Sequence, residues 1–351
     1  MKAILVTPGR SDSVRLAEVE EPAPWSSQAL LKVLELGIDG TDLDINAGTY
    51  GEAPAGSDYL IAGHECLAVV KEMHAETEGT TEGDLVVPTV RRPDNCINCA
   101  SGESDMCLTG NYKEHGIKGL HGFAGEYGVT DTRFLVRVPK QLVESIVLLE
   151  PMSVAEKGVF QAYKMQERMI WRPKRALVLG AGPLGLLTTY LLRCRGMEVH
   201  AVATRSADSP KARLVQRVGA TYVNSTEQPT NTLGKFDLIM EETGVPSVAM
   251  EALHLLNTNG IICFLGIYPH AQLFEDVGAL YTDMVLGNKT FFGSVNANKR
   301  YFEMGAKDFA VIEERFPGVL RDTITKVVPP SDYLKAYRPS RDDIKTIISF
   351  Q

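Results

Sequence analysis

The sequence lacks long hydrophobic runs, a large cysteine content and clustered basic residues. No stretch of its 351 residues approaches the roughly 18 consecutive apolar residues that a membrane-spanning helix needs. The N-terminal MKAILVTPGR has the pattern of a strand and not of a signal peptide, so we expect a cytoplasmic protein with no membrane partner. The net charge of -8 argues against nucleic acid as a partner, because nucleic-acid-binding proteins carry clustered Lys and Arg.

The 6 cysteines are too few for a disulfide scaffold in a chain of this length. Three of them, Cys96, Cys99 and Cys107, have the spacing C-x2-C-x7-C, which predicts a zinc-binding loop in a reducing compartment. A closed tetrahedral zinc site needs a fourth ligand, and no fourth cysteine is nearby. Asp94 and His115 are the closest alternatives, and the sequence does not decide between them. The competing interpretation is a loop that has lost its metal.

Length and pattern together predict two domains, since a single core seldom grows beyond about 250–300 residues. The first 150 residues show short strand signals separated by Gly, Pro and acidic turns, which predicts a small antiparallel barrel or sandwich. After residue 152, six strand signals alternate with helical patterns, as in a doubly wound parallel sheet. The strand-like end TIISFQ is expected to return to the first domain.

A glycine motif follows the first strand signal of the second region. Gly180, Gly182 and Gly185 have the G-x-G-x-x-G spacing, and a helix signal comes directly after them. The first glycine allows a tight turn, the second lets backbone approach a pyrophosphate, and the third lets the helix pack closely on the strand. The motif predicts a dinucleotide site; the alternative is a glycine-rich turn without a ligand.

The next strand signal indicates which dinucleotide is bound. It ends in Thr204, Arg205 and Ser206, without the Asp or Glu that usually holds the ribose 2′-hydroxyl of NAD. Arg205 can pair with a 2′-phosphate, to which Thr204 and Ser206 can donate hydrogen bonds. We therefore predict NADP as the preferred cofactor. If Arg205 is only a solvated loop residue, both NADP and NAD bind.

The order of the motifs resembles a known superfamily over essentially the whole chain. IDGTD, GHE, GDLVVPTVRR, the cysteine loop (residues 94–107), EYGV, LEP, VLGAGPLG and GSVN are similar to the zinc-containing medium-chain dehydrogenase/reductases. VRRPDNCINC, GIKGLHGFAGEY, LLEPMSVAEKG and NKTFFGSVN resemble, more specifically, the glucose 1-dehydrogenase branch described mainly in archaea. The resemblance implies an α/β protein with a GroES-like β-rich catalytic domain at residues 1–156 and 296–351. It also implies a Rossmann doubly wound parallel-sheet domain at 157–295, with the active site in the cleft between the domains.

The resemblance gives a meaning to Asp39. Most of the superfamily has cysteine at this place, whereas glucose dehydrogenases of halophilic archaea are similar to this chain in having aspartate. The resemblance implies that Asp39, His64 and Glu150 bind a catalytic zinc ion. Glu65 is expected to be a fourth ligand, or one that exchanges with water or substrate. Carboxylate oxygen and imidazole nitrogen suit zinc, although losing thiolate is expected to make the ion more labile and less selective. The alternative is that the catalytic zinc has been lost.

The resemblance implies oxidation of an aldose, D-glucose in first place, at C1 to the lactone, with hydride transfer to NADP+. Thr41 is expected to hydrogen-bond the reacting oxygen and relay its proton, and Asp42 to orient His64 through its other ring nitrogen. Glu114 and Asn296 are expected to bind sugar hydroxyls. The metal ligand Glu150 is also expected to contact the substrate. Further cofactor contacts are implied at Pro183, Leu184, Thr243, Gly244, Gly266, Ser294 and Asn296.

Three positions depart from the pattern of some relatives and leave the exact aldose and the loop metal open. Leu286 stands where certain relatives have histidine, Val90 where some have asparagine, and Pro93 where the superfamily's cysteine loop usually begins with cysteine. The competing functions are another zinc-dependent polyol or secondary-alcohol dehydrogenase, and a non-catalytic NADP-binding protein. We expect a homo-oligomer, dimer or tetramer, through edge-to-edge pairing of the strand TFFGSV.

Overall fold

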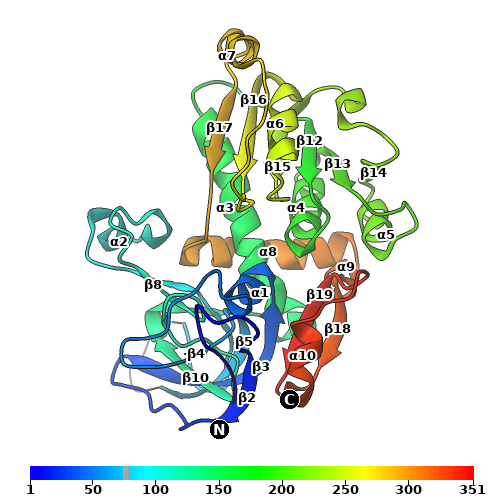
Figure 1. The fold of residues 1–351 in the computed structure, drawn as a ribbon. Helices are drawn as coiled ribbons and strands as arrows, with labels where there is room; N and C mark the ends of the chain where they lie inside the picture. The colour runs from blue at the N-terminus through cyan, green and yellow to red at the C-terminus, as the bar shows by residue number, and fades with distance from the viewer. Residues whose placement is uncertain (74–78) are drawn as a thin grey trace. The chain divides into compact units, whose positions relative to one another are not determined.

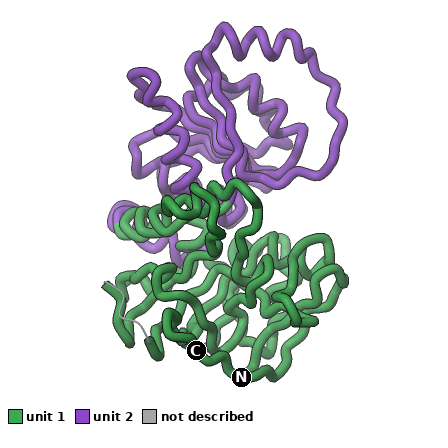
Figure 2. Tube along the Cα trace, turned by 90° about the vertical axis from the view of Figure 1, so that its left-hand side faces the viewer, with its two compact units in different colours: residues 1–153, 296–310, 324–351 green, residues 154–295, 311–323 purple. Residues whose placement is uncertain are grey.

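The computed structural model describes residues 1–73 and 79–351. Its backbone packing separates two compact units (Figure 1). The first contains Met1–Ser153, Asn296–Ala310 and Ile324–Gln351, so it combines pieces from both ends of the chain (Figure 2). The second contains Val154–Val295 and Val311–Thr323. Within the described ranges, no helix is long and apolar enough to cross a membrane.

The main sheet of the first unit is built around the long strand β3 (Gln28–Ile38), which pairs antiparallel with β5 (Glu65–Met73). The C-terminal strand β19 (Lys345–Ser349) pairs antiparallel with the other edge of β3, with Ile347 opposite Gly37. The chain end TIISFQ therefore lies in the first unit. The other strands of this sheet are β6 (Leu85–Pro88), β10 (Tyr127–Asp131), β11 (Leu135–Arg137) and β18 (Ile324–Val328).

Two smaller sheets complete the β-rich unit. One pairs β1 (Lys2–Val6) with β2 (Arg15–Glu18) and β4 (Leu60–Ile61). The other has the order β7-β8-β9 and lies beside the cysteine loop in the sequence. Its strands are β7 (Arg91–Arg92), β8 (Lys113–His115) and β9 (Gly119–Leu120), and the loop between them contains α2 (Ile97–Ala100) and the short helix η1 (Ser104–Met106).

The second unit contains a six-stranded parallel sheet with the order β14-β13-β12-β15-β16-β17. This is the strand order of a dinucleotide-binding doubly wound sheet, and its six strands coincide with the six strand signals of the sequence. The central strand β12 is buried at four of its five positions, because helices cover both faces of a parallel sheet. The strands are β12 (Arg175–Leu179), β13 (Glu198–Ala203), β14 (Thr221–Asn224), β15 (Phe236–Glu241), β16 (Leu256–Phe264) and β17 (Thr290–Gly293).

Helices connect these strands and lead into and out of the second unit. The helices are α3 (Leu149–Gln166), α4 (Pro183–Cys194), α5 (Pro210–Arg217), α6 (Pro246–His254), α7 (Val277–Leu286), α8 (Lys299–Arg315) and α9 (Val319–Thr323). Residues 311–323 pack with the second unit, although everything after 296 was expected to belong to the catalytic domain. The reason lies in α9, where Thr323 hydrogen-bonds the Tyr190 hydroxyl of α4 at 3.0 Å and Asp322 pairs with Arg217 of α5.

Candidate active site

Asp39 stands where β3 ends and α1 (Gly40–Asn46) begins, and it caps that helix. Its Oδ1 accepts a hydrogen bond from the backbone N–H of Asp42 at 3.1 Å, and Asp42 Oδ2 accepts one from the backbone N–H of Asp39 at 3.2 Å. This reciprocal capping box satisfies two N–H groups at the helix start. The second carboxylate oxygen, Oδ2, accepts a hydrogen bond from the Thr41 hydroxyl at 3.1 Å. The two oxygens of Asp39 thus face different partners.

His64 directly precedes β5 and faces Asp39. Its Nε2 lies 3.6 Å from Asp39 Oδ2, and its side chain is 5% exposed. Two ligand atoms of one tetrahedral zinc ion, each about 2.0–2.1 Å from the metal, lie about 3.3–3.4 Å apart. Ligand atoms of His64, Glu65 and Glu150 also lie within 4.8 Å of one another, as do those of Asp39, Asp42 and His64. His64 belongs to both groups, and Glu150 comes from the first turn of α3.

The charges of this cluster favour a bound cation. Burial raises the pKa of Asp42 to about 7 and that of Glu150 to about 8, and neighbouring carboxylates add to both shifts. Burial by itself would lower the pKa of His64, but Asp39, Asp42 and Glu150 raise it well above its ordinary value. Asp42 Oδ1 is buried and accepts no hydrogen bond from any described residue. The donor set therefore fits a divalent metal, which would relieve the repulsion between these carboxylates.

Lys345, which the sequence did not single out, provides a positive charge within this cluster. Its ammonium group forms an ion pair with Glu65, and the two side chains are 1% and 2% exposed. A Cβ atom at Gly37 would lie 2.0 Å from Glu65 Oε2 and 2.9 Å from Lys345 Cε, so glycine leaves the space that the pair needs. The only sequence signal for this pair is a lysine at the start of an otherwise uncharged strand, KTIIS.

The expected hydrogen bond between Asp42 and the other ring nitrogen of His64 is not formed. His64 Nδ1 is buried and has no hydrogen-bond partner among the described residues. The capping box holds only one oxygen of Asp42, Oδ2, through the backbone N–H of Asp39, while Oδ1 accepts no hydrogen bond from the described residues. Asp42 lies beside His64 and shares its charge environment, but its carboxylate serves the start of α1.

The two residues expected to bind sugar hydroxyls meet in the first unit. Asn296 Nδ2 donates a hydrogen bond to Glu114 Oε1 at 2.9 Å. Glu114 is buried and lies on β8, directly opposite Arg91 of β7. The Arg91 guanidinium approaches the same oxygen, Oε1, with Nε and Nη2, each at 3.0 Å. Burial raises the pKa of the Tyr50 phenol, and the charge of the Glu114 carboxylate raises it further.

The cysteine loop brings four possible metal ligands together. Ligand atoms of Asp94, Cys96, Cys99 and Cys107 lie within 4.8 Å of one another. The Sγ atoms of Cys96 and Cys107 are 3.9 Å apart, and Asp94 Oδ1 accepts a hydrogen bond from the Cys96 N–H at 2.8 Å. Three thiols and a carboxylate fit a closed tetrahedral zinc site. Asp94, and not His115, is therefore the fourth member of the group.

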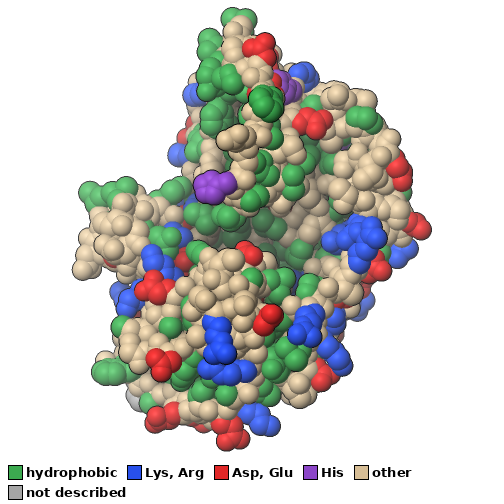
Figure 3. Space-filling view, in the orientation of Figure 1, with side chains coloured by type: hydrophobic (Ala, Val, Ile, Leu, Met, Phe, Trp, Pro, Cys, Tyr) green, Lys and Arg blue, Asp and Glu red, His purple; other side chains and the backbone are tan. Residues whose placement is uncertain are grey.

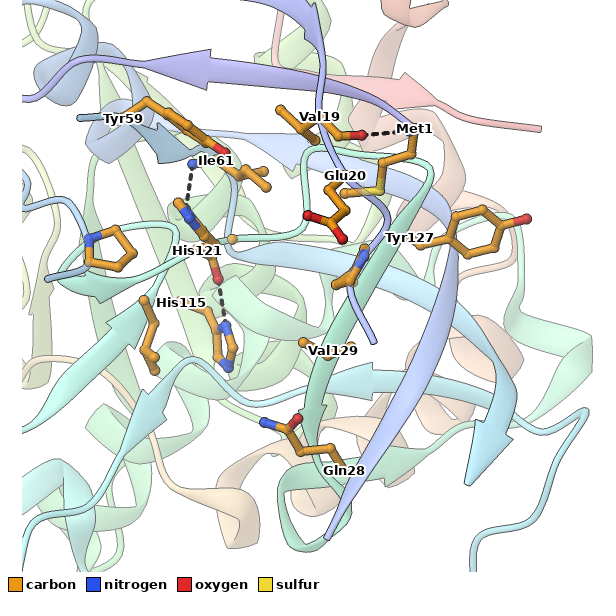
Figure 4. Close-up of a pocket in the computed structure, with 15 residues that line it drawn as sticks. Met1, Val19, Glu20, Gln28, Tyr59, Ile61, His115, His121, Tyr127 and Val129 are labelled. Carbon is orange, nitrogen blue, oxygen red and sulfur yellow. Dashed lines mark hydrogen bonds between the residues drawn. The ribbon is translucent and has the colours of Figure 1, made fainter. Parts of the chain in front are cut away.

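His115 has a different place in the first unit. Its Nδ1 lies 2.7 Å from the His121 carbonyl oxygen, so Nδ1 carries the proton and donates it. His115 and His121 line a cavity of about 290 Å³, together with Tyr59, whose ring stacks on that of His121 (Figure 4). Neighbouring side chains of a strand point to opposite faces, so His115 faces this cavity while Glu114 faces Arg91. Apart from His115, the alternative ligand of the cysteine loop, none of the residues expected to bind metal, cofactor or sugar lines the cavity.

In the second unit, the glycine motif forms the turn from β12 to α4. Gly180 has a φ of +111°, which favours glycine, and a Cβ at Gly185 would lie 2.0 Å from the Gly180 carbonyl oxygen. Gly182 is the N-cap of α4, and no atom lies within 4 Å of its missing Cβ, so the turn is open at this point. Pro183 and Leu184 follow as the first two residues of α4. Pro183 has no N–H, and the free N–H groups of the residues after it at the helix start suit a phosphate.

The end of β13 carries the residues expected to select the cofactor. Arg205 is half-buried, its carbonyl accepts a hydrogen bond from Tyr222, and its guanidinium makes no hydrogen bond or ion pair with the described residues. The Ser206 hydroxyl donates to Asp208, so a carboxylate lies close by that the sequence analysis did not consider. Thr204 is exposed.

The other expected cofactor contacts lie at the ends of β15, β16 and β17. The Thr243 hydroxyl donates to Glu241, and Gly244 has a φ of +65°. A Cβ at Gly266 would lie 2.4 Å from the Gly244 nitrogen, so these two glycines pack directly on each other. The Ser294 hydroxyl is buried and has no partner among the described residues.

Comparison with known proteins places the chain in a family. The alcohol dehydrogenase GroES-like domain family matches residues 26–140, and the glucose dehydrogenase C-terminus family matches residues 143–350. Glucose 1-dehydrogenase 1 of Caldivirga maquilingensis is 47% identical over 349 residues, covering 99% of this chain and 98% of that protein. The chain belongs to the glucose dehydrogenase family. Another family member, glucose 1-dehydrogenase of Thermoproteus tenax, is also 47% identical, with 100% of each chain covered.

Solved structures of dehydrogenases have the same fold as this chain. A structure of Haloferax mediterranei glucose dehydrogenase in complex with NADP, Zn and gluconolactone has a TM-score of 0.92 and 36% identity. It covers 100% of this chain, which covers 99% of it. A thermostable alcohol dehydrogenase of Pyrobaculum aerophilum, at 21% identity and a TM-score of 0.82, shares the fold, with 99% of both chains covered. The fold is therefore that of the zinc-dependent medium-chain dehydrogenases, of which the glucose dehydrogenase family is a branch.

Proposed function

We propose that this chain oxidises an aldose, D-glucose in first place, at C1 to the lactone and transfers the hydride to NADP+. The observation that carries the proposal is the buried group of carboxylates around His64, with Asp39 at a distance that suits two ligands of one zinc ion. The family relation supports the substrate, since full-length relatives are glucose 1-dehydrogenases. NADP, Zn and gluconolactone are bound together in the related Haloferax enzyme.

In this proposal, Asp39, His64 and Glu150 hold the catalytic zinc. A bound zinc ion polarises the sugar C1 hydroxyl and lowers its pKa. Glu65 is the ligand that exchanges, because its ion pair with Lys345 gives it a second partner when it leaves the metal. The mixed oxygen and nitrogen set suits zinc, but it lacks the soft thiolate that would favour zinc over harder ions.

Thr41 provides the route for the proton. Its hydroxyl hydrogen is directed at Asp39 Oδ2, so the lone pairs of Oγ1 remain free to accept a hydrogen bond from the sugar C1 hydroxyl. The sugar proton then moves to Thr41 Oγ1 while Thr41, which is half-buried, passes its own hydroxyl proton to water. The sugar is held by Glu114 and Asn296, whose shared hydrogen bond places both groups at one point.

NADP is the cofactor that the second unit suits best. The Arg205 guanidinium is available for the 2′-phosphate, and no Asp or Glu ends β13 to bind a ribose 2′-hydroxyl. Asp208 lies beside Ser206 and moderates this preference, so NAD remains a slower alternative. We also propose zinc in the cysteine loop with Asp94 as its fourth ligand. We propose a catalytic domain at residues 1–156 and 296–351, apart from residues 311–323, and a cofactor domain at 157–295 with which residues 311–323 pack.

The second unit also carries an apolar surface that suits a second copy of this chain. α7 exposes Tyr281, Val285 and Leu286 at 61%, 75% and 77%, and the edge strand β17 exposes Phe291 at 52%. In Figure 3, hydrophobic side chains gather along the edge of the second unit where Figure 1 places α7 and β17. β17 pairs only with β16 among the described strands, so its other edge is open for strand pairing. We propose a homo-oligomer that forms by antiparallel pairing of β17.

The test is a set of initial rates on the zinc-loaded protein. NADP+ and NAD+ are each offered with glucose, galactose, xylose and simple secondary alcohols, for wild type and Asp39→Ala. Aldose oxidation with NADP+ that collapses in the variant supports the proposal. Oxidation of alcohols alone would show a polyol or alcohol dehydrogenase, and cofactor binding without any turnover would show a non-catalytic NADP-binding protein.

A further inference from the structure

The buried Arg91 joins the proposed sugar carboxylate to the cysteine loop. β7 and β8 pair antiparallel with Arg91 directly opposite Glu114, and the two side chains are 4% and 5% exposed. Nε and Nη2 of Arg91 both lie 3.0 Å from Glu114 Oε1. Nη1 donates to the backbone carbonyl of Asp105, in the cysteine loop, at 3.3 Å. The guanidinium carbon lies 3.6 Å from the centre of the Tyr112 ring, which fixes the plane of the fork.

A second connection runs through the segment that begins α8. Asn296 donates to Glu114 Oε1 at 2.9 Å. Two residues later, Asn298 Nδ2 donates to Asp105 Oδ1 and to Glu103 Oε2, each at 2.8 Å. Asn298 is 6% exposed, so water does not compete for these hydrogen bonds. The same short segment therefore touches the sugar carboxylate at one end and the cysteine loop at the other.

These contacts leave one oxygen of Glu114 for a ligand. Oε1 already accepts hydrogen bonds from Arg91 Nε and Asn296 Nδ2, and Arg91 Nη2 lies 3.0 Å from it in the ion pair. Oε2 accepts no hydrogen bond from the described residues, and it is not among the buried atoms without a partner. A sugar hydroxyl can therefore donate a hydrogen bond to Oε2. Because the Arg91 guanidinium holds Oε1, it also fixes the direction in which Oε2 points.

We propose that Arg91 and Asn298 are positioning residues of the sugar site, and that through them the cysteine loop sets the affinity and hydroxyl selectivity of Glu114. The inference rests on the proposed function, because it concerns the same sugar site. Arg91 touches no reacting atom; it acts by holding Glu114. Asn298 touches neither Glu114 nor the proposed metal ligands, and it acts by fixing Asp105 and the start of α8.

The test uses the full-length zinc-loaded enzyme and three variants. Arg91→Lys keeps the positive charge but loses the planar guanidinium, whose fixed donors contact Glu114 and the Asp105 carbonyl together. A lysine ammonium cannot make both contacts in this geometry. Asn298→Ala removes the loop contact at a distance from Glu114. Arg92→Lys is the matched control, because Arg92 is the neighbouring residue on β7 and hydrogen-bonds Thr89 and Thr130 instead. Thermal unfolding confirms that each variant is folded.

The readouts are KM for glucose, KM for NADP+, kcat, and the ratio of kcat/KM for glucose over each monodeoxyglucose. Calorimetry of gluconolactone binding gives a measure that does not depend on turnover. We expect KM for glucose to rise about ten-fold in Arg91→Lys, by loss of one hydrogen bond to a charged group, and several-fold in Asn298→Ala. The same variants lose selectivity against one deoxyglucose, while KM for NADP+ stays within about two-fold and Arg92→Lys behaves as wild type.

Three outcomes overturn the inference. In the first, Asn298→Ala leaves both KM for glucose and the ratio of kcat/KM for glucose over each monodeoxyglucose unchanged. This result rejects the inference even if Arg91→Lys does not fold. Another is an equal effect in Arg92→Lys, which shows a general disturbance of β7. The third is a wild type that oxidises no aldose, which rejects the proposed function and the inference with it. A wild type active on glucose with unaffected variants rejects the inference alone.

Discussion

Replacing Lys345 by Met leaves a carboxylate without its partner in a region that water does not reach. Glu65 and Lys345 are 2% and 1% exposed, so solvent cannot take the place of the ammonium group. Glu65 must then remain charged at a high cost or take up a proton. Because protonation is available, the loss in the free energy of unfolding is at most about 1.4 kcal/mol for each pH unit above the ordinary pKa of the carboxyl. With an ordinary pKa of 4.5, the limit is about 3.4 kcal/mol at pH 7 and about 0.7 kcal/mol at pH 5.

The sign of the pH dependence follows from the direction of the pKa shift. Burial raises the pKa of Glu65 even beside Lys345, and loss of the ammonium group raises it further. The unfolded chain therefore releases the proton first, and the variant loses more stability than the wild type as the pH rises. The cost of Lys345→Met should therefore increase from pH 5 to pH 8. The double variant Lys345→Met/Glu65→Gln should recover most of it, because a neutral amide replaces the unpaired carboxylate.

The measurement is urea unfolding of the metal-free protein at several pH values between 5 and 8. The matched control is Lys326→Met, which breaks a more exposed ion pair with Asp343 at 2.9 Å and should cost less than about 1 kcal/mol. A loss of stability that is the same at pH 5 and pH 8, or one that Glu65→Gln does not recover, would refute the reasoning.

Four further predictions concern the cofactor site, the cysteine loop and the subunit surface. Arg205→Ala should raise KM for NADP+ about ten-fold or more and leave KM for NAD+ nearly unchanged, in steady-state kinetics with both cofactors. Asp94→Ala should lower the zinc content by one ion per chain, measured by elemental analysis, while the mutant retains the second ion. Glu242→Gln should be more stable than wild type by an amount that grows as the pH rises from 4.5 to about 8, because burial raises the pKa of Glu242 to about 8 and the carboxyl must be held neutral in the folded protein. Phe291→Lys should shift the oligomer towards smaller species in light scattering, since a charge on the edge of β17 opposes strand pairing.

Most of the fold could be predicted because it depends on local pattern. The strands of the second unit are apolar runs bounded by turns, and each lies where its hydrophobic pattern predicted a strand. The glycine spacing predicted a tight turn, and the close approach of Gly185 to the Gly180 carbonyl is its geometric cause. The packing of residues 311–323 with the second unit depends on contacts between α9 and helices more than a hundred residues earlier, such as the pair of Asp322 with Arg217.

The residues that the sequence did not reveal act through partners distant in the chain. Arg91 and Glu114 are 23 residues apart and meet because β7 and β8 pair in one register. Lys345 reaches Glu65 because the last strand returns to β3. Asp94 was one of two alternatives for the cysteine loop, and distance in sequence to the three cysteines could not separate it from His115. The structure separates them, because the His115 side chain faces away from the cysteines and hydrogen-bonds the carbonyl oxygen of His121.

The capping role of Asp39 ties its proposed role as a metal ligand to the folding of α1. One oxygen of the carboxylate closes the helix and the other faces His64, so a single side chain does both. A thiol at this position offers zinc a stronger ligand but a poor acceptor for the Asp42 N–H, and loss of a good N-cap costs about 1 kcal/mol. Selection or engineering at position 39 therefore cannot strengthen the hold on the ion without loosening the helix that carries Thr41. In the proposed site, tighter zinc binding and a well-ordered proton relay would therefore be competing demands on one residue.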